Sequence, residues 1–462
     1  HKEYRRQRQM CIRDRYTLYI VCEPKKRIIA SHIKIKTKMK VKNLLLAGLA
    51  VAAMTACSNN DEIVENGIQT TGEEASMQIN LKFADQGTRA VSGEPDEGAD
   101  FERESSTVTA IIVYPNSTKN KVYKNLTLVE GSNKTYKTEA FSVEAANGVN
   151  VYAIINYDAD KANALAATAN LTELTVGAQS LPDKGLAYIA ETVAKENAFL
   201  MSGSTAEPID IEAGSTTNVA PITVDRVAAK LDELTNLSEA FTIENGDKIY
   251  NTTGKAVSVK LEGFSFSNLS SDSYIFGGKT SASSWLQQYI PATGTATDAT
   301  YRWITEGVTY CLENNTIANP TRVHYKGQVC LDETPINEDF FIRAITFDGV
   351  TTYRLFTTWD ALTTYYDNAA ITALDPSKPA DLAKYGIMKY LGGICYYEAD
   401  IKTYSPTEST SVLRNNWYQL TVNKITKIGL PTPAPEPTPD ATMLTIETTV
   451  KPWTIQVNGY DL

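Results

Sequence analysis

The C-terminal stretch, residues 443–462, constrains the fold most, because it is patterned as a β-strand. Its first apolar face has a period of two, typical of a half-buried strand, and consists of Leu444, Ile446, Thr448 and Val450. Pro452 cannot donate to a ladder, so we expect two short strand pieces joined by a kink or bulge. Beyond it the apolar series continues at Trp453, Ile455 and Val457.

A proline-rich segment, residues 431–442, precedes this strand. Prolines at alternate positions from 431 to 439 predict an extended, polyproline-like spacer of about 3 Å per residue. Such a spacer holds the terminal strand away from the body, where its apolar side chains are costly to leave in water. Two interpretations remain open. The strand is donated to another molecule, or it pairs as the final strand of its own domain.

A second alternating strand lies near the other end of the chain. Its apolar positions are Met77, Ile79, Leu81 and Phe83. A polar, glycine-containing stretch with one basic residue follows, and exposed segments of this kind are where proteases cut. Cleavage between Arg89 and Ala90 would remove the strand and leave a groove that a neighbour's C-terminal strand could fill. The alternative is an ordinary first strand that stays in its sheet.

The region before this strand has the pattern of an export signal. Residues 39–57 combine a short basic segment, an apolar segment too short to span a membrane, and Met-Thr-Ala-Cys, which resembles a bacterial lipobox. We expect lipidation of Cys57; a plain secretory signal with an incidental cysteine is the alternative. Residues 1–38 carry a net charge of +9 and are interpreted as non-native upstream sequence, rather than as a basic arm for nucleic acid or anionic lipid.

The body of the chain is predicted to be β throughout. Runs rich in Val, Ile, Tyr and Thr alternate with turn-forming clusters, which favours β-sandwiches. We expect a propeptide at 58–89, an N-terminal sandwich at 90–237 and a C-terminal sandwich at 238–430. The predicted strands are 108–114, 149–156, 222–231, 257–266, 322–325, 340–347 and 417–425, with short helices at 160–169 and 359–368.

The residue pattern argues against catalysis and against a metal site. After the signal, His324 is the only histidine, and it lies in a predicted strand, so a structural role is favoured over a catalytic pair. The oxygen spacing Asn156-x-Asp158-x-Asp160 opens like a calcium loop, but Lys161 occupies the position of the turn glycine. A solvated turn is therefore expected, and no cofactor or metal is predicted.

Three cysteines remain after Cys57. Cys311 and Cys330 could form one disulfide, and free buried thiols are the alternative for these two and for Cys395. The formal charge of −10 becomes −19 for residues 39–462 once the +9 of residues 1–38 is removed, which disfavours nucleic-acid binding.

Taken together, these features resemble the Bacteroidales fimbrillin superfamily, the type V pilins, and most closely the shaft subunits of its minor fimbria. Beside the lipobox and the proline spacer, the resemblance is carried by short strings in a fixed order. They are residues 199–203 (FLMSG), 224–231 (VDRVAAKL), 310–315 (YCLENN), 321–328 (TRVHYKGQ), 393–397 (GICYY), 414–422 (RNNWYQLTV) and 428–431 (IGLP).

The resemblance implies an all-β fold of two transthyretin-like, Greek-key β-sandwich domains with a C-terminal donor strand. It also implies an outer-membrane lipoprotein precursor that is cut by an Arg-specific protease and polymerises head to tail into an adhesive cell-surface fimbrium with anchor and tip subunits. On this interpretation lipidation falls on Cys57 and cleavage between Arg89 and Ala90. The receptor is not identified, and no enzymatic activity is expected. The alternatives are an anchor subunit of the same fimbrium and a monomeric surface lipoprotein that binds glycans, which would show clustered exposed aromatic residues and a tail folded back.

Overall fold

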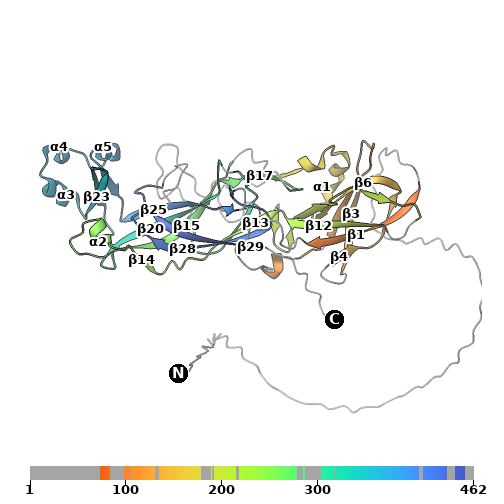
Figure 1. Ribbon diagram of the computed structural model, residues 1–462, viewed down its shortest axis with the longest axis horizontal. Helices are drawn as coiled ribbons and strands as arrows, with labels where there is room; N and C mark the ends of the chain where they lie inside the picture. The colour runs from red at the N-terminus through yellow and green to blue at the C-terminus, as the bar shows by residue number, and fades with distance from the viewer. Residues whose placement is uncertain are drawn as a thin grey trace, which may run out of the picture. The chain divides into compact units, whose positions relative to one another are not determined.

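A computed structural model of the protein describes most of the chain after residue 72. The described ranges are 73–83, 98–130, 135–177, 189–277, 285–286, 303–404, 409–433 and 443–452, with short gaps at 103, 106, 190–191, 215–217 and 317. The chain divides into two compact units, His1–Cys57 and Ser58–Leu462, and every described residue belongs to the second. This part is built mainly of β-strands (Figure 1).

The first large sheet has nine strands. They are β1 (Glu74–Phe83), β2 (Thr107–Val113), β3 (Lys121–Glu130), β4 (Thr135–Thr138), β5 (Phe141–Glu144), β6 (Ala146–Ile155), β10 (Met201–Ser204), β11 (Ile209–Ile211) and β12 (Asn218–Arg226). Their order is β10-β12-β1-β4-β3-β2-β6-β11, with β5 also paired to β1. Because β10 pairs with β6 as well as with β12, the path of hydrogen-bonded strands returns to its start. The sheet therefore forms a closed ring, and its strands contribute buried aliphatic and aromatic side chains to the hydrophobic core.

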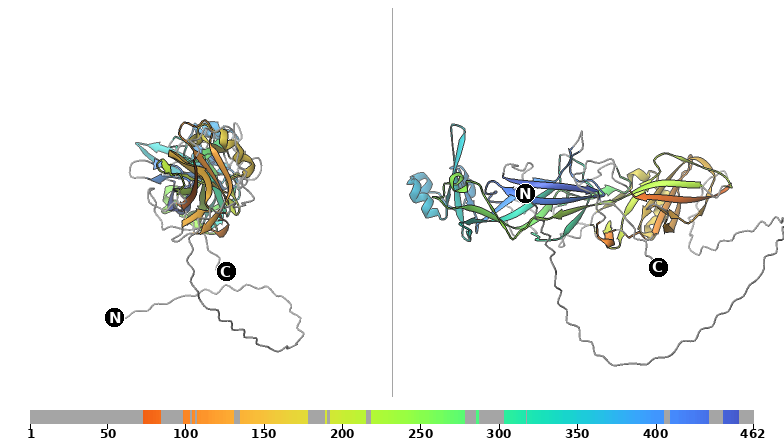
Figure 2. Two further views of the ribbon diagram at one scale, coloured as in Figure 1. Left: turned by 90° about the vertical axis from the view of Figure 1, so that its right-hand side faces the viewer. Right: turned by 60° about the horizontal axis from the view of Figure 1, so that its bottom comes forward.

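Two further sheets follow along the chain. A four-stranded sheet has the order β19-β13-β28-β29 and consists of β19 (Val308–Leu312), β13 (Ala228–Glu233), β28 (Asn416–Ile425) and β29 (Leu444–Pro452). A five-stranded sheet is built on the long pair β15 and β20, and consists of β14 (Ala240–Thr242), β15 (Val257–Ser267), β20 (Arg322–Leu331), β21 (Thr334–Pro335) and β25 (Ile394–Asp400). Figure 2 shows β28 and β29, in blue, lying side by side.

Strands β12 and β13 are nearly continuous in sequence but belong to different sheets. Alternate residues of β12 are buried, as expected for a strand with one inward face, whereas β13 is buried along most of its length. The change of partner occurs at Val227, ten residues before the predicted domain boundary at 237, which stays a prediction. In β10, which pairs with β12, position 203 must be a glycine, because a Cβ atom there would lie only 2.0 Å from the Thr223 carbonyl oxygen.

A smaller group of elements has its own apolar cluster. It contains the three-stranded sheet β23-β22-β24, of β22 (Phe340–Phe347), β23 (Val350–Phe356) and β24 (Ile387–Tyr390), with helices α3 (Trp359–Tyr366), α4 (Ala369–Thr372) and α5 (Pro379–Ala383). Thr358 caps α3 through its side chain, and Asp367 ends the helix in the left-handed conformation.

The remaining elements are short. The helical ones are α1 (Ala159–Ala162), α2 (Gly246–Ile249) and three 3-10 turns, Asp100–Glu102, Asn163–Ala167 and Leu171–Glu173. The two-stranded pairs are β7 (Thr175–Gly177) with β17 (Asp272–Tyr274), β8 (Ala194–Lys195) with β9 (Ala198–Phe199), β16 (Leu269–Ser270) with β18 (Trp285–Leu286), and β26 (Thr403–Tyr404) with β27 (Ser409–Thr410).

The predicted strands and both predicted helical segments are confirmed, with the run at 222–231 divided between β12 and β13. The three cysteines are buried free thiols, so Cys311 and Cys330 do not form the disulfide that the sequence allowed. Asp158 caps α1 by accepting from the Asp160 backbone N–H, which agrees with a turn rather than a calcium loop. Among the described residues, no helix is long and apolar enough to cross a membrane, and no cluster of potential metal ligands occurs.

Buried His324 in β20 predicts acid sensitivity. Its Nε2 lies 2.6 Å from Ser267 Oγ, and its Nδ1 lies 3.6 Å from Glu398 Oε2. Burial, with Arg322 nearby, lowers the pKa of His324 from 6.5 to about 3. Between these values the unfolded chain holds a proton that the folded chain excludes. The free energy of unfolding should therefore fall as the pH drops from 6.5 toward 3, by up to about 1.4 kcal/mol per pH unit from this group.

The His324→Gln variant should lose this part of the acid slope, because glutamine does not titrate and still offers a hydrogen bond toward Ser267. Urea unfolding at several pH values between about 4 and 7 measures the slope in both proteins. Equal slopes over that range would contradict the prediction.

Candidate assembly site

Strand β1 occupies an interior position in the ring of strands. One edge pairs in parallel with β12, from Met77 opposite Asn218 to Phe83 opposite Val224. The other edge pairs antiparallel with β5 at its beginning and with β4 at its end. The strand predicted to be removable is therefore bonded on both sides, and without it β12, β4 and β5 would each present an unpaired edge.

The inward face of β1 is fully buried. Met77, Ile79 and Leu81 have no solvent exposure, which agrees with the predicted alternation. Burial of three such side chains contributes about 6 kcal/mol. Two side chains from neighbouring segments add polar contacts, since the Ile79 N–H donates to Thr138 Oγ1 (3.0 Å) and Asn218 Nδ2 donates to the Ser76 carbonyl (3.1 Å).

The tail strand β29 pairs antiparallel with β28 of the same chain. The register places Ile446 opposite Val422, Thr448 opposite Leu420 and Val450 opposite Tyr418, with a bulge between Val422 and Lys424. Those three β28 residues are buried, and directly opposed residues in an antiparallel pair share a face. The positions predicted to be apolar thus belong to the face of the sheet that β28 buries.

The position of β29 differs from that of β1, because among the described strands β29 is the last of its sheet and pairs on one edge. Leu444 is buried, and the Met443 carbonyl accepts hydrogen bonds from Thr426 N (2.9 Å) and Lys427 N (3.3 Å). Pairing within its own domain is the second of the two interpretations that the sequence left open, and it is the arrangement observed here.

Several predicted site residues lie outside the described residues. These are the lipidation position Cys57, the cleavage positions Arg89 and Ala90, and the tail positions Trp453, Ile455 and Val457. For Phe83 the structure describes the backbone pairing with Val224 but not the side chain.

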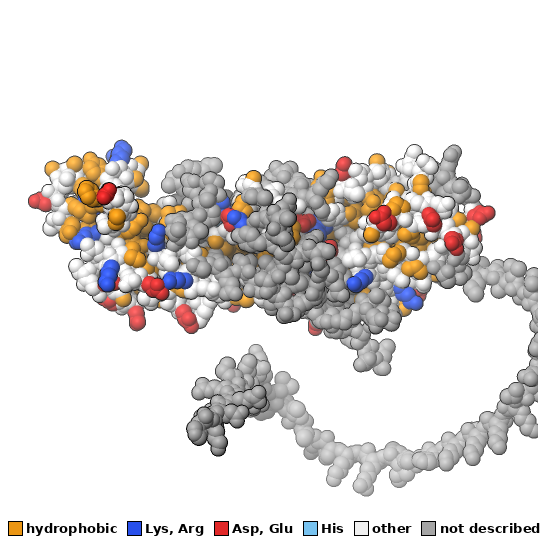
Figure 3. Space-filling model, viewed as in Figure 1, with side chains coloured by type: hydrophobic (Ala, Val, Ile, Leu, Met, Phe, Trp, Pro, Cys, Tyr) orange, Lys and Arg blue, Asp and Glu red, His pale blue; other side chains and the backbone are white. Residues whose placement is uncertain are grey.

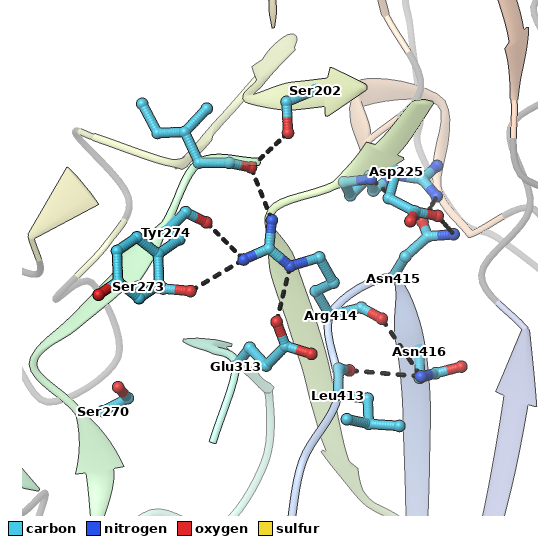
Figure 4. Close-up of polar contacts among 12 residues, drawn as sticks. Ser202, Asp225, Ser270, Ser273, Tyr274, Glu313, Leu413, Arg414, Asn415 and Asn416 are labelled. Carbon is cyan, nitrogen blue, oxygen red and sulfur yellow. Dashed lines mark hydrogen bonds and ion pairs between the residues drawn. The ribbon is translucent and has the colours of Figure 1, made fainter. Parts of the chain in front are cut away.

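A buried polar network lies where β28 begins (Figure 4). The Arg414 side chain, 1% exposed, pairs through Nε with Glu313 Oε2 at 2.9 Å. Its Nη1 donates to the Ile275 carbonyl (2.7 Å), and its Nη2 donates to Ser273 Oγ (2.9 Å) and to the Tyr274 carbonyl. The Ile275 carbonyl also accepts from the Ser202 hydroxyl, so one guanidinium joins the start of β28 to strand β10 of the ring.

A second buried network surrounds Glu102. Its carboxylate pairs with Lys230 Nζ at 2.9 Å and accepts from the Tyr310 hydroxyl, while its carbonyl accepts from Arg226 Nε at 3.0 Å. Burial, together with this carboxylate, raises the pKa of Tyr310, which keeps the phenol a hydrogen-bond donor. Lys230 Nζ also lies 3.8 Å from the centre of the Trp417 ring. These contacts link the 3-10 turn before β2 to β13, β19 and β28.

Sequence reasoning assigned no role to Glu102, Arg226 or Arg414. Arg226 and Arg414 fall within the strings that carry the family resemblance. A physical signal was present for Arg226, because its phase in β12 is that of the inward residues Ile222 and Val224. A charged residue at an inward strand position needs a buried partner.

Residues 388–459 match the model of the family described as major fimbrial subunit protein type IV, fimbrillin, C-terminal. The match runs from β24 into the tail and confirms the resemblance predicted from the sequence; the family is a structural one and not an enzyme family. None of the curated proteins matches the chain.

Among solved structures, the chain is similar to a putative cell adhesion protein from Parabacteroides distasonis ATCC 8503 (14% identity, 82% of this chain and 99% of that chain, TM-score 0.47). It is also similar to a fimbrilin from Porphyromonas gingivalis W83 (16% identity, 83% and 99%, TM-score 0.44). A third similarity is to the tip fimbrial protein Mfa3 from Porphyromonas gingivalis (13% identity, 82% and 100%, TM-score 0.36).

Removal of one partner from the Glu102 network should destabilise the protein strongly. The Glu102→Gln variant leaves the Lys230 ammonium buried beside a neutral amide, which should cost about 3 to 5 kcal/mol of unfolding free energy. Denaturant unfolding of the full chain measures the loss. The Asp375→Asn variant, which breaks an exposed ion pair with Lys378, is the control and should unfold like the unmodified protein. Equal stability of the two variants would show that the buried carboxylate is not needed.

Proposed function

We propose that this chain, whose C-terminal residues match the fimbrillin family, is a shaft subunit of a cell-surface fimbrium and polymerises by strand exchange. The observation that carries the proposal is the contrast between its two alternating strands. β1 is an interior strand upstream of a predicted cleavage point, and β29 is an edge strand at the end of a proline-rich spacer. One strand is thus positioned to be lost and the other to be donated.

The exchange would proceed in two steps. Cleavage after Arg89 would separate the segment from the lipidated Cys57 to Arg89 from the rest of the chain. Departure of β1 would then expose the apolar positions around Met77, Ile79 and Leu81 together with the unpaired edges of β12, β4 and β5. The C-terminal strand of a neighbour would then leave β28, where it pairs on one edge, and enter a position that offers pairing on both edges. The net gain in backbone pairing and apolar burial favours the polymer.

This exchange is head to tail. The donating surface and the accepting groove are different parts of the molecule, so the contact is heterologous and need not close into a ring. Repetition produces a filament. The lipid on Cys57 would hold the precursor at the outer membrane until cleavage, since Cys57 belongs to the removed segment.

A monomeric glycan-binding lipoprotein is the second candidate. The observation that favours it is the pairing of β29 with β28 of the same chain, which is the folded-back tail expected for that alternative. An anchor subunit of the same fimbrium would also retain β1. These candidates predict a surface protein that begins at Cys57 and remains uncleaved.

Processing distinguishes the candidates. The proposal predicts that the protein recovered from the cell surface begins at Ala90 and forms ladders of polymer, and that the Arg89→Ala variant accumulates as a lipidated monomer. N-terminal sequencing and gel analysis of surface fractions measure both properties. Recovery of the unmodified protein only as a lipidated monomer that begins at Cys57 would support an anchor subunit or the glycan-binding alternative.

The tail provides a separate test. Deletion of residues 443–462 should abolish polymers and leave a folded, exported monomer, because the donor strand is gone while the ring with β1 is intact. The double variant Ile446→Asp with Val450→Asp should act in the same way, since charge at these positions opposes burial. The matched control places the same charges on the other face, Thr445→Asp with Thr449→Asp, and should still polymerise.

Electron microscopy and size-exclusion chromatography after proteolytic processing measure polymer length in all variants. Fibres of normal length from the tail deletion would eliminate the donor assignment. Equal loss of polymer in both double variants would show that polymerisation does not depend on which face of the strand, that of Ile446 and Val450 or that of Thr445 and Thr449, is buried.

A further inference from the structure

The hairpin of β22 and β23 carries a ladder of paired residues on the face that packs against α3. Alternate cross-strand pairs share this face, and from the base to the tip they are Phe341 with Phe356, Arg343 with Arg354, Ile345 with Thr352, and Phe347 with Val350. Figure 2 shows the hairpin, in cyan, extending away from the neighbouring strands. Figure 3 shows hydrophobic side chains gathered over the part that carries α3, α4, α5 and β23 in Figure 1.

The base of this face is a packed apolar cluster. Phe341 and Phe356 are buried with Leu362 of α3, and the Phe341 ring lies 5.2 Å from the ring of Trp359. This packing fixes the hairpin against α3. The next pair of residues along the face is therefore held in a defined position.

That next pair consists of two arginines, directly opposite one another. The Arg343 guanidinium carbon lies 3.9 Å from the centre of the Tyr366 ring, and that of Arg354 lies 4.0 Å from the centre of the Tyr365 ring. Arg343 Nε also donates to the Tyr385 carbonyl at 3.2 Å. Each guanidinium thus lies over an aromatic ring, which leaves the N–H groups at its edge for an acceptor.

No carboxylate of the described residues forms an ion pair with either arginine. Among the described residues, neither Arg343 nor Arg354 has an Asp or Glu oxygen within 4.0 Å, whereas the three lysines of the same region each pair with an aspartate. Like charges directly opposite on adjacent strands are destabilising. The tyrosines hold the arginines in place, but the need for two cations at this position is not explained by stability.

The face beyond the arginines is open to solvent and mixes apolar and hydroxyl groups. Ile345 is 39% exposed, Phe347 is 82% exposed and Val350 is 66% exposed. Tyr365 is also half exposed, and the Thr352 hydroxyl lies on the same face, where it donates to the Ile345 carbonyl. A ligand seated here meets a cationic pair at one end and an apolar, hydroxyl-bearing surface at the other.

From this juxtaposition we infer that the arginine pair, Arg343 and Arg354, is the binding site for an acidic saccharide with a single carboxylate. Guanidinium forks match a carboxylate through two parallel hydrogen bonds. The C–H faces of a pyranose ring pack against aromatic and aliphatic side chains, and its hydroxyls match the threonine. A polyanion such as an acidic peptide is disfavoured, because Asp348 in the hairpin turn, Asp360 in α3 and Asp367 at the end of α3 have no lysine or arginine partner within 4.0 Å among the described residues.

The site lies within β22, β23 and α3, apart from both β1 and β29. The site shares no residue with either strand, so failure to polymerise would not bear on ligand binding by the monomer. The proposal concerns ligand binding alone.

Binding of 3′-sialyllactose to the full chain, measured by isothermal titration calorimetry, tests the site, with lactose as the neutral counterpart. The acidic sugar should bind at least about 10-fold tighter than lactose, as charge-assisted hydrogen bonds require. Arg354→Gln and Arg343→Gln should each lose about 10-fold or more of that affinity. Arg354→Lys keeps the charge but not the fork, and should not restore it fully. The control Lys384→Gln removes an equal charge from the C-cap of α5 and should bind like the unmodified chain.

Equal affinity for sialyllactose and lactose, or no binding of either, would overturn the proposal. So would arginine variants that bind like the unmodified chain, or a tetra-glutamate peptide that competes as well as the sugar. Circular dichroism verifies that each variant is folded. If an arginine variant does not fold, the comparison of the two sugars on the unmodified chain still decides.

Discussion

Pairing of β1 on both of its edges is the interaction on which the ring of strands depends. Every strand on the closed path, from β10 through β12, β1, β4, β3 and β2 to β6, has a partner on each side, so the ring contains no free edge. Interruption at any one strand creates two edges at once, and each carries unpaired N–H and C=O groups. At β1 it would also uncover the pocket filled by Met77, Ile79 and Leu81. A ring closed by β1 has its backbone groups paired while β1 stays, and removal of β1 would expose edges that can pair with another strand.

Buried ions connect this ring to the sheet that holds the tail. Arg226 ends β12, Lys230 lies in β13 and Arg414 precedes β28, and each is held by a carboxylate or by carbonyl oxygens from another element. Such groups contribute little net stability, because desolvation offsets their attraction. They do destabilise other strand registers, since a shift of one residue in β12 or β28 would turn a charged side chain away from its partner. We interpret them as fixing the register of the strands around β29 and β12.

The sequence predicted the elements better than their connections. Period-two alternation located β1 and β29, and both have the expected inward phase, at Ile79 by burial and at Ile446 by register. Alternation is a local property of the sequence, so it does not identify the strand with which a given strand pairs. Closure of the ring through β10, and the change of partner at Val227, depend on contacts between distant residues. The sequence did not predict the buried charged groups between the ring and the sheet of β28 for the same reason. Glu102 and Lys230 are separated by more than one hundred positions and come into contact only in the folded chain.

The two alternating strands differ in the number of strands that pair with them, and this difference would give the proposed exchange a direction. Departure of β29 breaks one backbone ladder, to β28, whereas occupation of the position of β1 makes ladders to β12 on one side and to β4 and β5 on the other. The ordering cost is similar in both places, since the same extended strand is fixed. A tail that moved from the edge of its own sheet to an interior position in a neighbour would gain hydrogen bonds and apolar contact, and this gain has to exceed the translational and rotational entropy lost on association. While β1 fills the interior position no such gain is available, so the edge of β28 is the favoured place for the tail of an uncleaved chain.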